Sequence, residues 1–167
     1  MCIDFWNLNK VSLQDNYPLP KMDHILQRVV GASQMSLLDG YSGYNQILAH
    51  EKYQYKTSFT TPWGTFWYAK MPFGLKNAGA TFQRAMDISF ANEKDVFMVV
   101  YLDYLTVFSG SNDEHLHHLR IVFQRCEKFG ISLNPKKSIF AMDEGKLLGH
   151  IVSKDGICID PSRVEEI

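Results

Sequence analysis

The feature that most constrains the fold is the segment 96–108, where an acidic residue lies between two runs of strand-forming residues. Residues 96–100 and 105–108 are rich in β-branched and aromatic side chains, and neither Gly nor Pro separates them. This pattern predicts a tight β-hairpin with Asp103 at its tip. A single Asp at a turn is most often only a turn former, so this residue alone does not indicate a function.

A second acid, Asp39, has a similar place in the sequence. It follows the short apolar run 35–38 and precedes Gly40. Carboxylates at the ends of two strands converge if the strands are neighbours in one sheet. Mg²⁺ prefers oxygen ligands at about 2.1 Å, so Asp39 and Asp103 together form a candidate metal site.

The rest of the chain predicts an α+β fold. Helices are predicted at residues 22–30, 77–89 and 113–129. Short strands are predicted at 35–38, 131–133, 138–140 and 146–152. Residues 53–68 are predicted to form a hairpin with its turn at 61–64, and residues 44–48 a helix or an extended piece. Asn77 is a plausible N-cap for the second helix. The apolar stripe of the third helix is predicted to be Leu116, Leu119, Val122, Phe123 and Cys126. Strands mixed with helices, without regular β-α alternation, indicate α+β.

Composition sets outer bounds on the kind of protein. The chain has 167 residues, 46% of them apolar, which is enough for one substantial core. There is no apolar run of about 18 residues and no signal-peptide pattern, so we expect an intracellular protein without a membrane partner, in the cytoplasm, the nucleus or an organelle such as a mitochondrion. The three cysteines lack Cys-x-x-Cys spacing and are expected to be free thiols. His115, His117 and His118 lack the i, i+4 spacing of zinc proteases.

Charge is unevenly distributed along the chain. The net charge of −1 argues against a large basic surface. In the window 51–84, however, Glu51 is the only acid. The bases of this window are Lys52, Lys56, Lys70, Lys76 and Arg84, and its aromatic residues include Tyr53, Tyr55, Phe59, Trp63, Phe66, Trp67, Tyr68 and Phe73. Bases among aromatics can hold phosphates and stack on nucleobases. A hairpin with a buried aromatic face and a lysine-rich outer face would give the same pattern.

A series of ordered motifs extends over nearly the whole chain. They are CIDF at 2–5, LNK at 8–10, DNYPLP at 15–20, LD at 38–39, SGYNQI at 42–47, KTSF at 56–59, MPFGLKNA at 71–78, ATFQ at 80–83, YLD at 101–103 and LGHIVS at 148–153, followed by Gly156 and Asp160-Pro161. Together they resemble the reverse transcriptase of gypsy-type LTR retrotransposons. The resemblance implies fingers and palm, with an antiparallel palm sheet backed by helices. It assigns 1–14 and 47–77 to the fingers, 15–46 and 78–157 to the palm, and 158–167 to the start of a connection to a missing thumb.

The resemblance implies an RNA-directed DNA polymerase. Its partners would be an RNA or DNA template with a primer, and deoxynucleoside triphosphates. In such enzymes a primer 3′-hydroxyl attacks the α-phosphate while two Mg²⁺ ions, about 3.5–4 Å apart, neutralise charge; Mn²⁺ can replace them. By resemblance Asp39 and Asp103 are the catalytic metal ligands, and a third acid belongs at position 104.

Position 104 is a tyrosine in this chain. A phenol with a pKa near 10 is neutral at pH 7 and is a poor Mg²⁺ ligand. We therefore expect strongly impaired or absent catalysis. Two alternatives stay open beside a weakened enzyme: a nucleic-acid-binding remnant that cannot catalyse, and a retrotransposon relic without function.

Further site residues carry over by resemblance. They are Tyr44, Phe73 and Gly74 at the nucleotide, Gln83 and Tyr101 at the template and primer, and Lys137 as the donor of a proton to the leaving pyrophosphate. Tyr44 as core filler and Lys137 as an ordinary surface lysine are the alternatives.

The chain also departs from the family pattern at several positions. Trp6 replaces an Arg, Gly79 a Pro and Ser138 a Cys, and the family's Trp-Arg pair before the residue matching Met1 is absent. These departures imply weaker nucleotide binding. They suggest an open reading frame within an old pol gene, or a fragment of such a gene.

Overall fold

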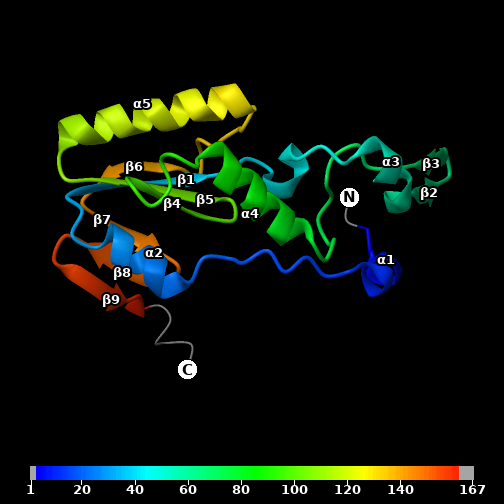
Figure 1. The fold of residues 1–167 in the computed structure, drawn as a ribbon, viewed down its shortest axis with the longest axis horizontal. Coiled ribbons are helices and arrows are strands. Elements are labelled where there is room, and N and C mark those ends of the chain that lie inside the picture. The colour runs from blue at the N-terminus through cyan, green and yellow to red at the C-terminus, as the bar shows by residue number, and fades with distance from the viewer. Residues whose placement is uncertain (1–2, 162–167) are drawn as a thin grey trace.

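The computed structural model describes residues 3–161 and centres on a four-stranded antiparallel sheet (Figure 1). Its strands are β1 (Gln34–Asp39), β4 (Met98–Tyr101), β5 (Tyr104–Ser109) and β6 (Ile139–Met142), in the order β4-β5-β1-β6. The predicted hairpin is therefore present as β4 and β5. Asp39, the last residue of β1, pairs with Tyr104, the first residue of β5. Sheet order thus brings the hairpin turn to the end of β1.

Two helices, α4 (Ala78–Ser89) and α5 (Asn112–Phe129), cover one face of this sheet (Figure 1). The core between them and the sheet consists of Leu38, Met71, Ala78, Phe82, Met86, Phe90, Met98, Val100, Leu105, Val107, Leu119, Val122 and Cys126. Helix α5 begins at a Ser111 side chain that accepts a hydrogen bond from the Glu114 amide, and it ends at left-handed Gly130.

The opposite face of the sheet packs on α2 (Met22–Val29) and on a second antiparallel sheet. That sheet contains β7 (Glu144–Leu147), β8 (His150–Ser153) and β9 (Gly156–Ile159). The second core consists of Ile25, Leu26, Val29, Met35, Val99, Leu147 and Val152. We call α2, α4, α5, β1 and β4–β9 the sheet body. It has a core on both faces of its central sheet.

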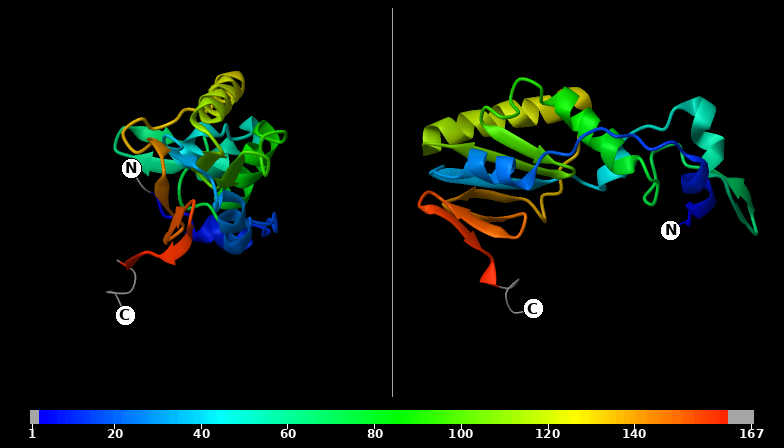
Figure 2. Two further views of the ribbon diagram at one scale, coloured as in Figure 1. Left: turned by 90° about the vertical axis from the view of Figure 1, so that its left-hand side faces the viewer. Right: turned by 60° about the horizontal axis from the view of Figure 1, so that its bottom comes forward.

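A smaller part, the outer lobe, comprises residues 3–11 and 50–70 and lies at the far end from β9 (Figure 2). Its elements are α1 (Trp6–Val11), α3 (Glu51–Gln54), a 3-10 turn (Tyr55–Thr57), β2 (Phe59–Thr61) and β3 (Gly64–Phe66). A second 3-10 turn, Gly43–Gln46, follows β1. The strap, residues 12–20, connects α1 to α2 along the body (Figure 1).

Most predicted elements are confirmed. The helices expected at 22–30, 77–89 and 113–129 are α2, α4 and α5, and the strand expected at 35–38 is β1. The α+β class is confirmed as well, because antiparallel sheets are backed by helices. The described cysteines Cys126 and Cys158 are free, and burial raises the pKa of the Cys126 thiol to about 11.

Four local predictions are wrong. Residues 53–57 are helical, because the His50 side chain caps a short helix by accepting from the Lys52 amide. The predicted strand 146–152 is a hairpin, and 131–133 contributes only a Leu133 bridge to Gly40. Leu116 and Phe123 are 64% and 42% exposed, and His115 is buried on the inner face of α5 instead.

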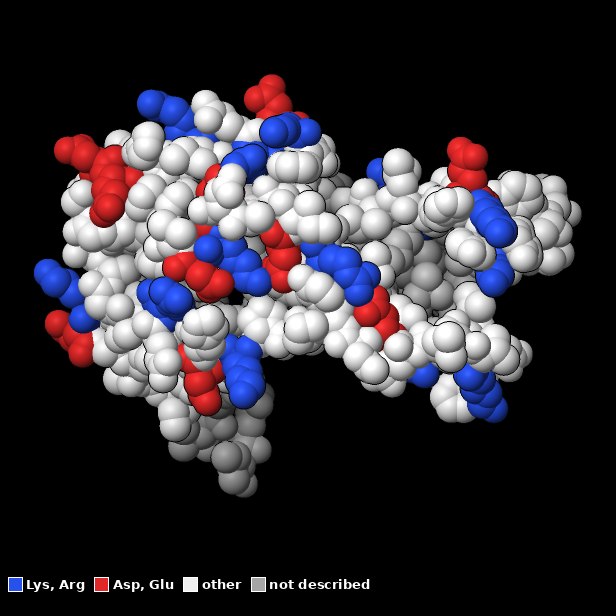
Figure 3. All heavy atoms as spheres, in the orientation of Figure 1, with Lys and Arg blue, Asp and Glu red and all other residues white. Residues whose placement is uncertain are grey.

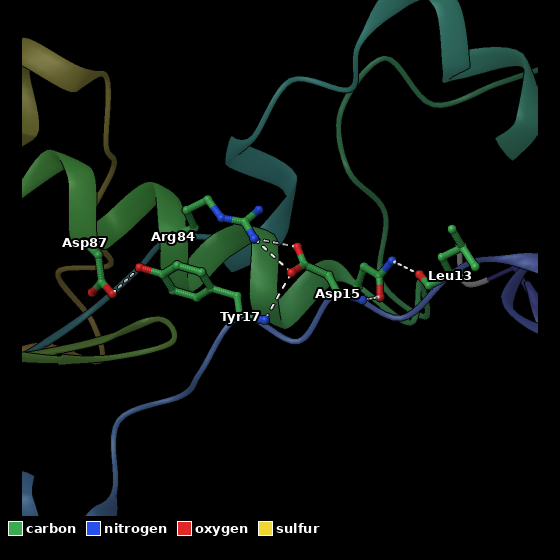
Figure 4. A network of polar contacts seen from close by, with 6 residues as sticks. Leu13, Asp15, Tyr17, Arg84 and Asp87 are labelled. Carbon is green, nitrogen blue, oxygen red and sulfur yellow. Dashed lines mark hydrogen bonds and ion pairs between the residues drawn. The ribbon is translucent and has the colours of Figure 1, made fainter.

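Asn77 precedes α4 as predicted, but its side chain makes no cap hydrogen bond. That side chain instead donates to the Leu13 carbonyl and accepts from the Asp15 amide, which fastens the strap (Figure 4). Within residues 3–161, every helix is too short or too polar to span a membrane.

Candidate active site

The turn between β4 and β5 rests directly on the residue that follows β1. The Gly40 amide donates to the Asp103 carbonyl at 2.7 Å. A Cβ added at Gly40 would lie 3.3 Å from that carbonyl oxygen and 3.4 Å from the Asp103 Cβ. A larger residue would push the turn away, so glycine permits the close approach that brings Asp103 next to Asp39.

The two predicted acids therefore lie in one place. Asp39 is 8% exposed. Burial raises the pKa of the Asp103 carboxyl, the negative charge of Asp39 raises it further, and the backbone amide of Asp103 and the Lys137 ammonium act in the opposite direction. A Cβ at Gly43 would be 3.5 Å from Asp103 Oδ2, so this carboxylate lies over the segment 40–43.

This donor set fits a hard divalent cation. Mg²⁺ binds to one or two carboxylates and completes its shell with water and substrate phosphate oxygens. A bound cation would also relieve the repulsion between Asp39 and Asp103, which adds to the larger effect of burial in raising the pKa of Asp103. In the part of the chain that the structure describes, three or more His, Cys, Asp or Glu residues do not gather anywhere into a metal site. Asp39 and Asp103 are thus the acids that this site offers.

Tyr104 stands opposite Asp39 across the β1–β5 pair and is 52% exposed. Both residues line a cavity of about 490 Å³ together with Tyr101 and Lys137. The β7–β8 turn, at Leu148, forms another wall of the same cavity. Position 104, expected to carry the third acid, thus faces this cavity.

The loop that follows α5 fastens the backbone of Asp39. The Asn134 amide donates to the Asp39 carbonyl at 2.8 Å, and the Asp39 amide donates to Ser138 Oγ at 3.2 Å. The Ser138 hydroxyl in turn donates to the Asn134 carbonyl at 2.7 Å. Ser138, where the resemblance expects Cys, therefore supports the site. The same loop places exposed Lys137 beside the cavity.

Tyr44, Phe73 and Gly74 lie between the acids and the outer lobe. The Tyr44 ring packs against Phe73 and Phe82, with ring centroids 5.4 and 5.6 Å apart. Burial raises the pKa of Tyr44, and the charge of Asp103 adds to this, so its hydroxyl is near the acids. Phe73 is 50% exposed and, with Asn45 and other residues, lines a separate cavity of about 490 Å³.

Gly74 has a left-handed backbone with φ +91°, which favours glycine. The Asn9 side chain holds this turn: it donates to the Gly74 carbonyl at 2.7 Å and accepts from the Lys76 amide at 2.8 Å. Helix α1 of the outer lobe thus fixes the loop that precedes α4.

Gln83 is placed differently from the expectation that it faces a template. Its side chain is fully buried at 0% exposure. It donates to Asp87 and to the Val100 carbonyl and accepts from the Leu102 amide. In this structure the Gln83 side chain thus contacts the hairpin turn from inside the core.

A polar network that the sequence did not predict joins the strap to α4 (Figure 4). Arg84 pairs with Asp15 at 2.8 Å, and its guanidinium lies 4.6 Å from the ring centre of Tyr17. The Tyr17 hydroxyl donates to Asp87 at 2.8 Å. The sequence offered one signal for this network. The polar motif DNYPLP at 15–20 is followed, far along the chain, by the oppositely charged residues Arg84 and Asp87 on α4.

The outer lobe exposes aromatic side chains close to lysines. Tyr53, Tyr55, Trp63 and Trp67 are 50%, 62%, 86% and 55% exposed. Lys56 Nζ lies 4.9 Å from the centre of the Tyr53 ring. A buried aromatic face is therefore wrong for these four residues. On the face in Figure 3, Lys and Arg are interspersed with Asp and Glu over the sheet body, so basic groups do not form one large patch there.

The sheet, the helices behind it and the acids at its strand ends define the fold of a reverse transcriptase. The foamy viral protease-reverse transcriptase in complex with an RNA/DNA hybrid matches with a TM-score of 0.87, 22% identity, and coverage of 98% of this chain and 22% of that one. Its dRH form in complex with double-stranded DNA matches with a TM-score of 0.90 and 22% identity, covering 100% of this chain and 30% of that one.

Sequence comparison identifies the family. Residues 1–152 match the family "Reverse transcriptase (RNA-dependent DNA polymerase)". The Pol polyprotein of transposon 297 from Drosophila melanogaster is 38% identical over 99% of this chain, and that of transposon gypsy is 35% identical over 100%. The RNA-directed DNA polymerase homolog of Oenothera berteroana is 41% identical, over 77% of this chain and 93% of that protein. The chain thus belongs to the reverse transcriptase family, and it spans 16% of the length of the transposon 297 and gypsy polyproteins.

Proposed function

We propose that this chain carries the site of an RNA-directed DNA polymerase whose catalysis is strongly reduced by Tyr104. The observation that carries the proposal is the close approach of the Asp103 turn to Gly40, which places Asp103 beside Asp39. Position 104, directly across from Asp39, holds a phenol where a further carboxylate would face the same cavity.

The sheet body then corresponds to the palm, residues 15–46 and 78–157. Residues 1–14 and 47–77, which include the outer lobe, correspond to the fingers, and 158–167 begin the connection to a thumb; residues 162–167 lie outside the described part of the chain. The partners would be a template with its primer and deoxynucleoside triphosphates. The foamy viral protease-reverse transcriptases were solved in complex with an RNA/DNA hybrid and with double-stranded DNA, which supports nucleic acid as the partner class.

Asp39 and Asp103 would hold Mg²⁺ or Mn²⁺ in this site. When bound, such ions polarise phosphoryl oxygens and lower the pKa of an attacking hydroxyl. Tyr44, Phe73 and Gly74 would bind the nucleotide, because they lie next to the acids and Phe73 lines an open cavity.

Two further residues face the cavity beside the acids. Tyr101 would contact the primer, because it lines this cavity together with Asp39. Lys137 lies near enough to lower the pKa of Asp103. It would give a proton to the leaving pyrophosphate.

Tyr104 weakens this site by removing a charge. A carboxylate at position 104 would give the site three negative charges toward the ions, and the phenol leaves two. Charge stabilisation of this kind lowers the activation barrier by several kcal/mol. Its loss therefore slows the reaction by about 10³-fold or more. The half-exposed ring of Tyr104 also fills part of the cavity where a primer end would lie.

A second candidate function, nucleic-acid binding without catalysis, is supported by the outer lobe. Trp63 at 86% exposure and Tyr55 at 62% present ring faces on which bases can stack. Lys52 and Lys56 lie beside Tyr53 and would contact phosphates. This function would persist after the loss of polymerisation.

Primer extension on an RNA template with MgCl₂ or MnCl₂ tests the proposal. The protein is compared with its Tyr104→Asp variant and with an Asp103→Asn control, and primer–template binding is measured in parallel by fluorescence anisotropy. We expect binding by all three proteins, extension by Tyr104→Asp, and extension by the native chain that is weaker by about 10³-fold or more. Asp103→Asn should not extend.

Other outcomes separate the candidates. Equal extension by the native chain and Tyr104→Asp would show that two carboxylates suffice and that Tyr104 is no lesion. Binding by every protein without any extension would favour the second candidate. Failure of all three folded proteins to bind would contradict both functions and would favour a relic.

A further inference from the structure

The turn that carries Asp103 has a strained backbone. Leu102 has φ 54°, in the left-handed region that residues with a β-carbon rarely adopt. Such a conformation persists only when neighbouring groups hold it, and it tends to occur at functional sites. The Gly40 amide holds the carbonyl of Asp103 from one side. From the α4 side, the Leu102 amide donates to Gln83 Oε1 at 2.8 Å.

The surroundings of Gln83 determine which way its amide points. Its Nε2 lies 3.0 Å from Asp87 Oδ1 and 3.3 Å from the Val100 carbonyl, which can only accept hydrogen bonds. The NH₂ group must therefore face these two oxygens, which leaves Oε1 facing the Leu102 amide. Because the side chain is fully buried, water cannot replace any of these partners at low cost.

Asp87 is itself held from the strap and from the segment after α4. The Tyr17 hydroxyl donates to its Oδ2 (Figure 4). Lys94 Nζ lies 2.8 Å from its Oδ1. A continuous series of hydrogen bonds therefore leads from Tyr17 through Asp87 and Gln83 to Leu102, the neighbour of Asp103.

We propose that Gln83 is a positioning residue: its buried amide fixes the Leu102–Asp103 turn and so holds the Asp103 carboxylate beside Asp39. This role adds a residue to the proposed site. Its effect on metal binding rests on the proposed function, whereas its effect on the turn does not. Gln83 acts from the helix side of the sheet, where its side chain is fully buried. Residues that orient metal ligands typically change metal affinity by about 10- to 100-fold when they are replaced.

The test uses the full chain and two readouts measured by NMR. The first is hydrogen exchange of the Leu102 amide, which requires no metal. The second is the affinity for Mn²⁺, added as MnCl₂ alone and followed by paramagnetic broadening of the Gly40 amide signal. Both are measured at a temperature where circular dichroism shows each variant to be folded. Ser89→Ala is the matched control, because Ser89 is also a buried polar residue of α4, and its hydroxyl donates to the Ala85 carbonyl within the same helix.

We expect Gln83→Leu to speed exchange at Leu102 and to weaken Mn²⁺ binding by about 10- to 100-fold, while Ser89→Ala changes neither. Gln83→Glu keeps the shape and can still accept from Leu102, but it turns an oxygen toward Asp87 and should show a similar loss. Adding Asp87→Asn to Gln83→Glu supplies a donor to that oxygen and should restore part of both readouts, because the Val100 carbonyl still faces an oxygen and Lys94 loses its carboxylate partner. General damage to packing would not be reversed in this way.

The proposal is overturned if Gln83→Leu and Gln83→Glu leave Leu102 exchange unchanged, or if Ser89→Ala has the same effect as either. If Gln83→Leu does not fold, the isosteric variant Gln83→Glu, measured with and without Asp87→Asn, tests the proposal in its place. A separate Asp103→Asn control addresses the proposed function: equal Mn²⁺ binding by this variant and the native chain would refute the metal site. Leu102 exchange would then decide the role of Gln83 alone.

Discussion

The sheet body buries two of its phenylalanines completely in its core, whereas most aromatic residues of the outer lobe are exposed. In the body, Phe82 and Phe90 are 1% and 0% exposed, whereas in the lobe Trp63 and Tyr55 are 86% and 62% exposed. Among residues 3–161, both apolar core clusters belong to the body and the chain beside it, and the lobe contributes to neither. The difference indicates that the buried rings of the body stabilise the fold, whereas the exposed rings of the lobe are available to a partner.

The largest expected effect is on stability. Phe82→Ala removes a ring that is 1% exposed and packs against Tyr44, so it should lower the free energy of unfolding by about 3–5 kcal/mol. Trp63→Ala should change it by no more than about 0.5 kcal/mol. Urea unfolding followed by circular dichroism measures both. Comparable losses in the two variants would remove the contrast between body and lobe.

The next effect concerns binding. Trp63→Ala should weaken the binding of a primer–template by about 1–3 kcal/mol if a base stacks on the ring. Phe140→Ala is the control, because Phe140 is 47% exposed on β6 and packs on Phe123 of α5, away from the lobe. Fluorescence anisotropy at fixed salt gives both affinities. Unchanged binding in Trp63→Ala would mean that the exposed ring does not serve nucleic acid.

A smaller effect is expected from pH, through buried His115 in the body. Its ring bonds to the hydroxyls of Ser36 and Ser109, and Ser109 also bonds to His118. Burial lowers the pKa of His115, and the charge of His118 lowers it further. The unfolded chain therefore binds the proton more readily. Stability should fall as pH drops below about 6.5, with a slope of up to about 1.4 kcal/mol per pH unit, until the folded-state pKa is passed.

His115→Gln keeps a polar partner for the two serines but does not titrate, so its stability should depend less on pH between about 7 and 5. Exposed His24 on α2 is the control, and His24→Gln should keep the native slope. Denaturant unfolding at several pH values supplies the measurement. An unchanged slope in His115→Gln would assign the pH dependence to other groups.

The smallest effect tests the packing of α4 near the turn. A Cβ at Gly79 would meet Leu102 Cδ2 and the Tyr44 hydroxyl at 3.7 Å, an ordinary contact. Gly79→Ala should therefore raise the free energy of unfolding by about 0.5–1 kcal/mol, because alanine has the higher helix propensity. Gly130→Ala should lower it, since Gly130 has φ +66°. Thermal unfolding compares the two, and a loss in Gly79→Ala would show that the turn has less room than its contacts suggest.

Much of the fold was predictable because its signals are local. Runs of strand-forming residues predicted the β4–β5 hairpin, and period-3.6 patterns predicted the three longer helices. The strand prediction for 53–57 was wrong because alternating aromatic and polar residues are also typical of a strand, while the interaction that favours the helix is a cap from His50. The predicted apolar stripe of α5 was wrong in part because His115, which bonds to two buried serines, occupies a core position.

The candidate site was predictable where a residue type and a strand end coincide, as for Asp39 and Asp103. The burial of Gln83 was not predictable, because the same amide suits an exposed or an internal position and only the tertiary fold decides between them. The Asp15–Arg84 pair was missed because its partners lie 69 residues apart in sequence.

The pairing of Asp39 with Tyr104 also bears on how such a chain changes over time. Directly opposed residues of an antiparallel pair share one face, and like charges there are destabilising by about 0.2–1 kcal/mol. An acid at position 104 would set two carboxylates against each other whenever metal is absent, so the catalytic form of this sheet tolerates a standing repulsion. Tyrosine removes it. If the proposed loss of an acid at position 104 took place, the substituted chain would be the more stable one, and a change back to an acid would cost that gain in stability.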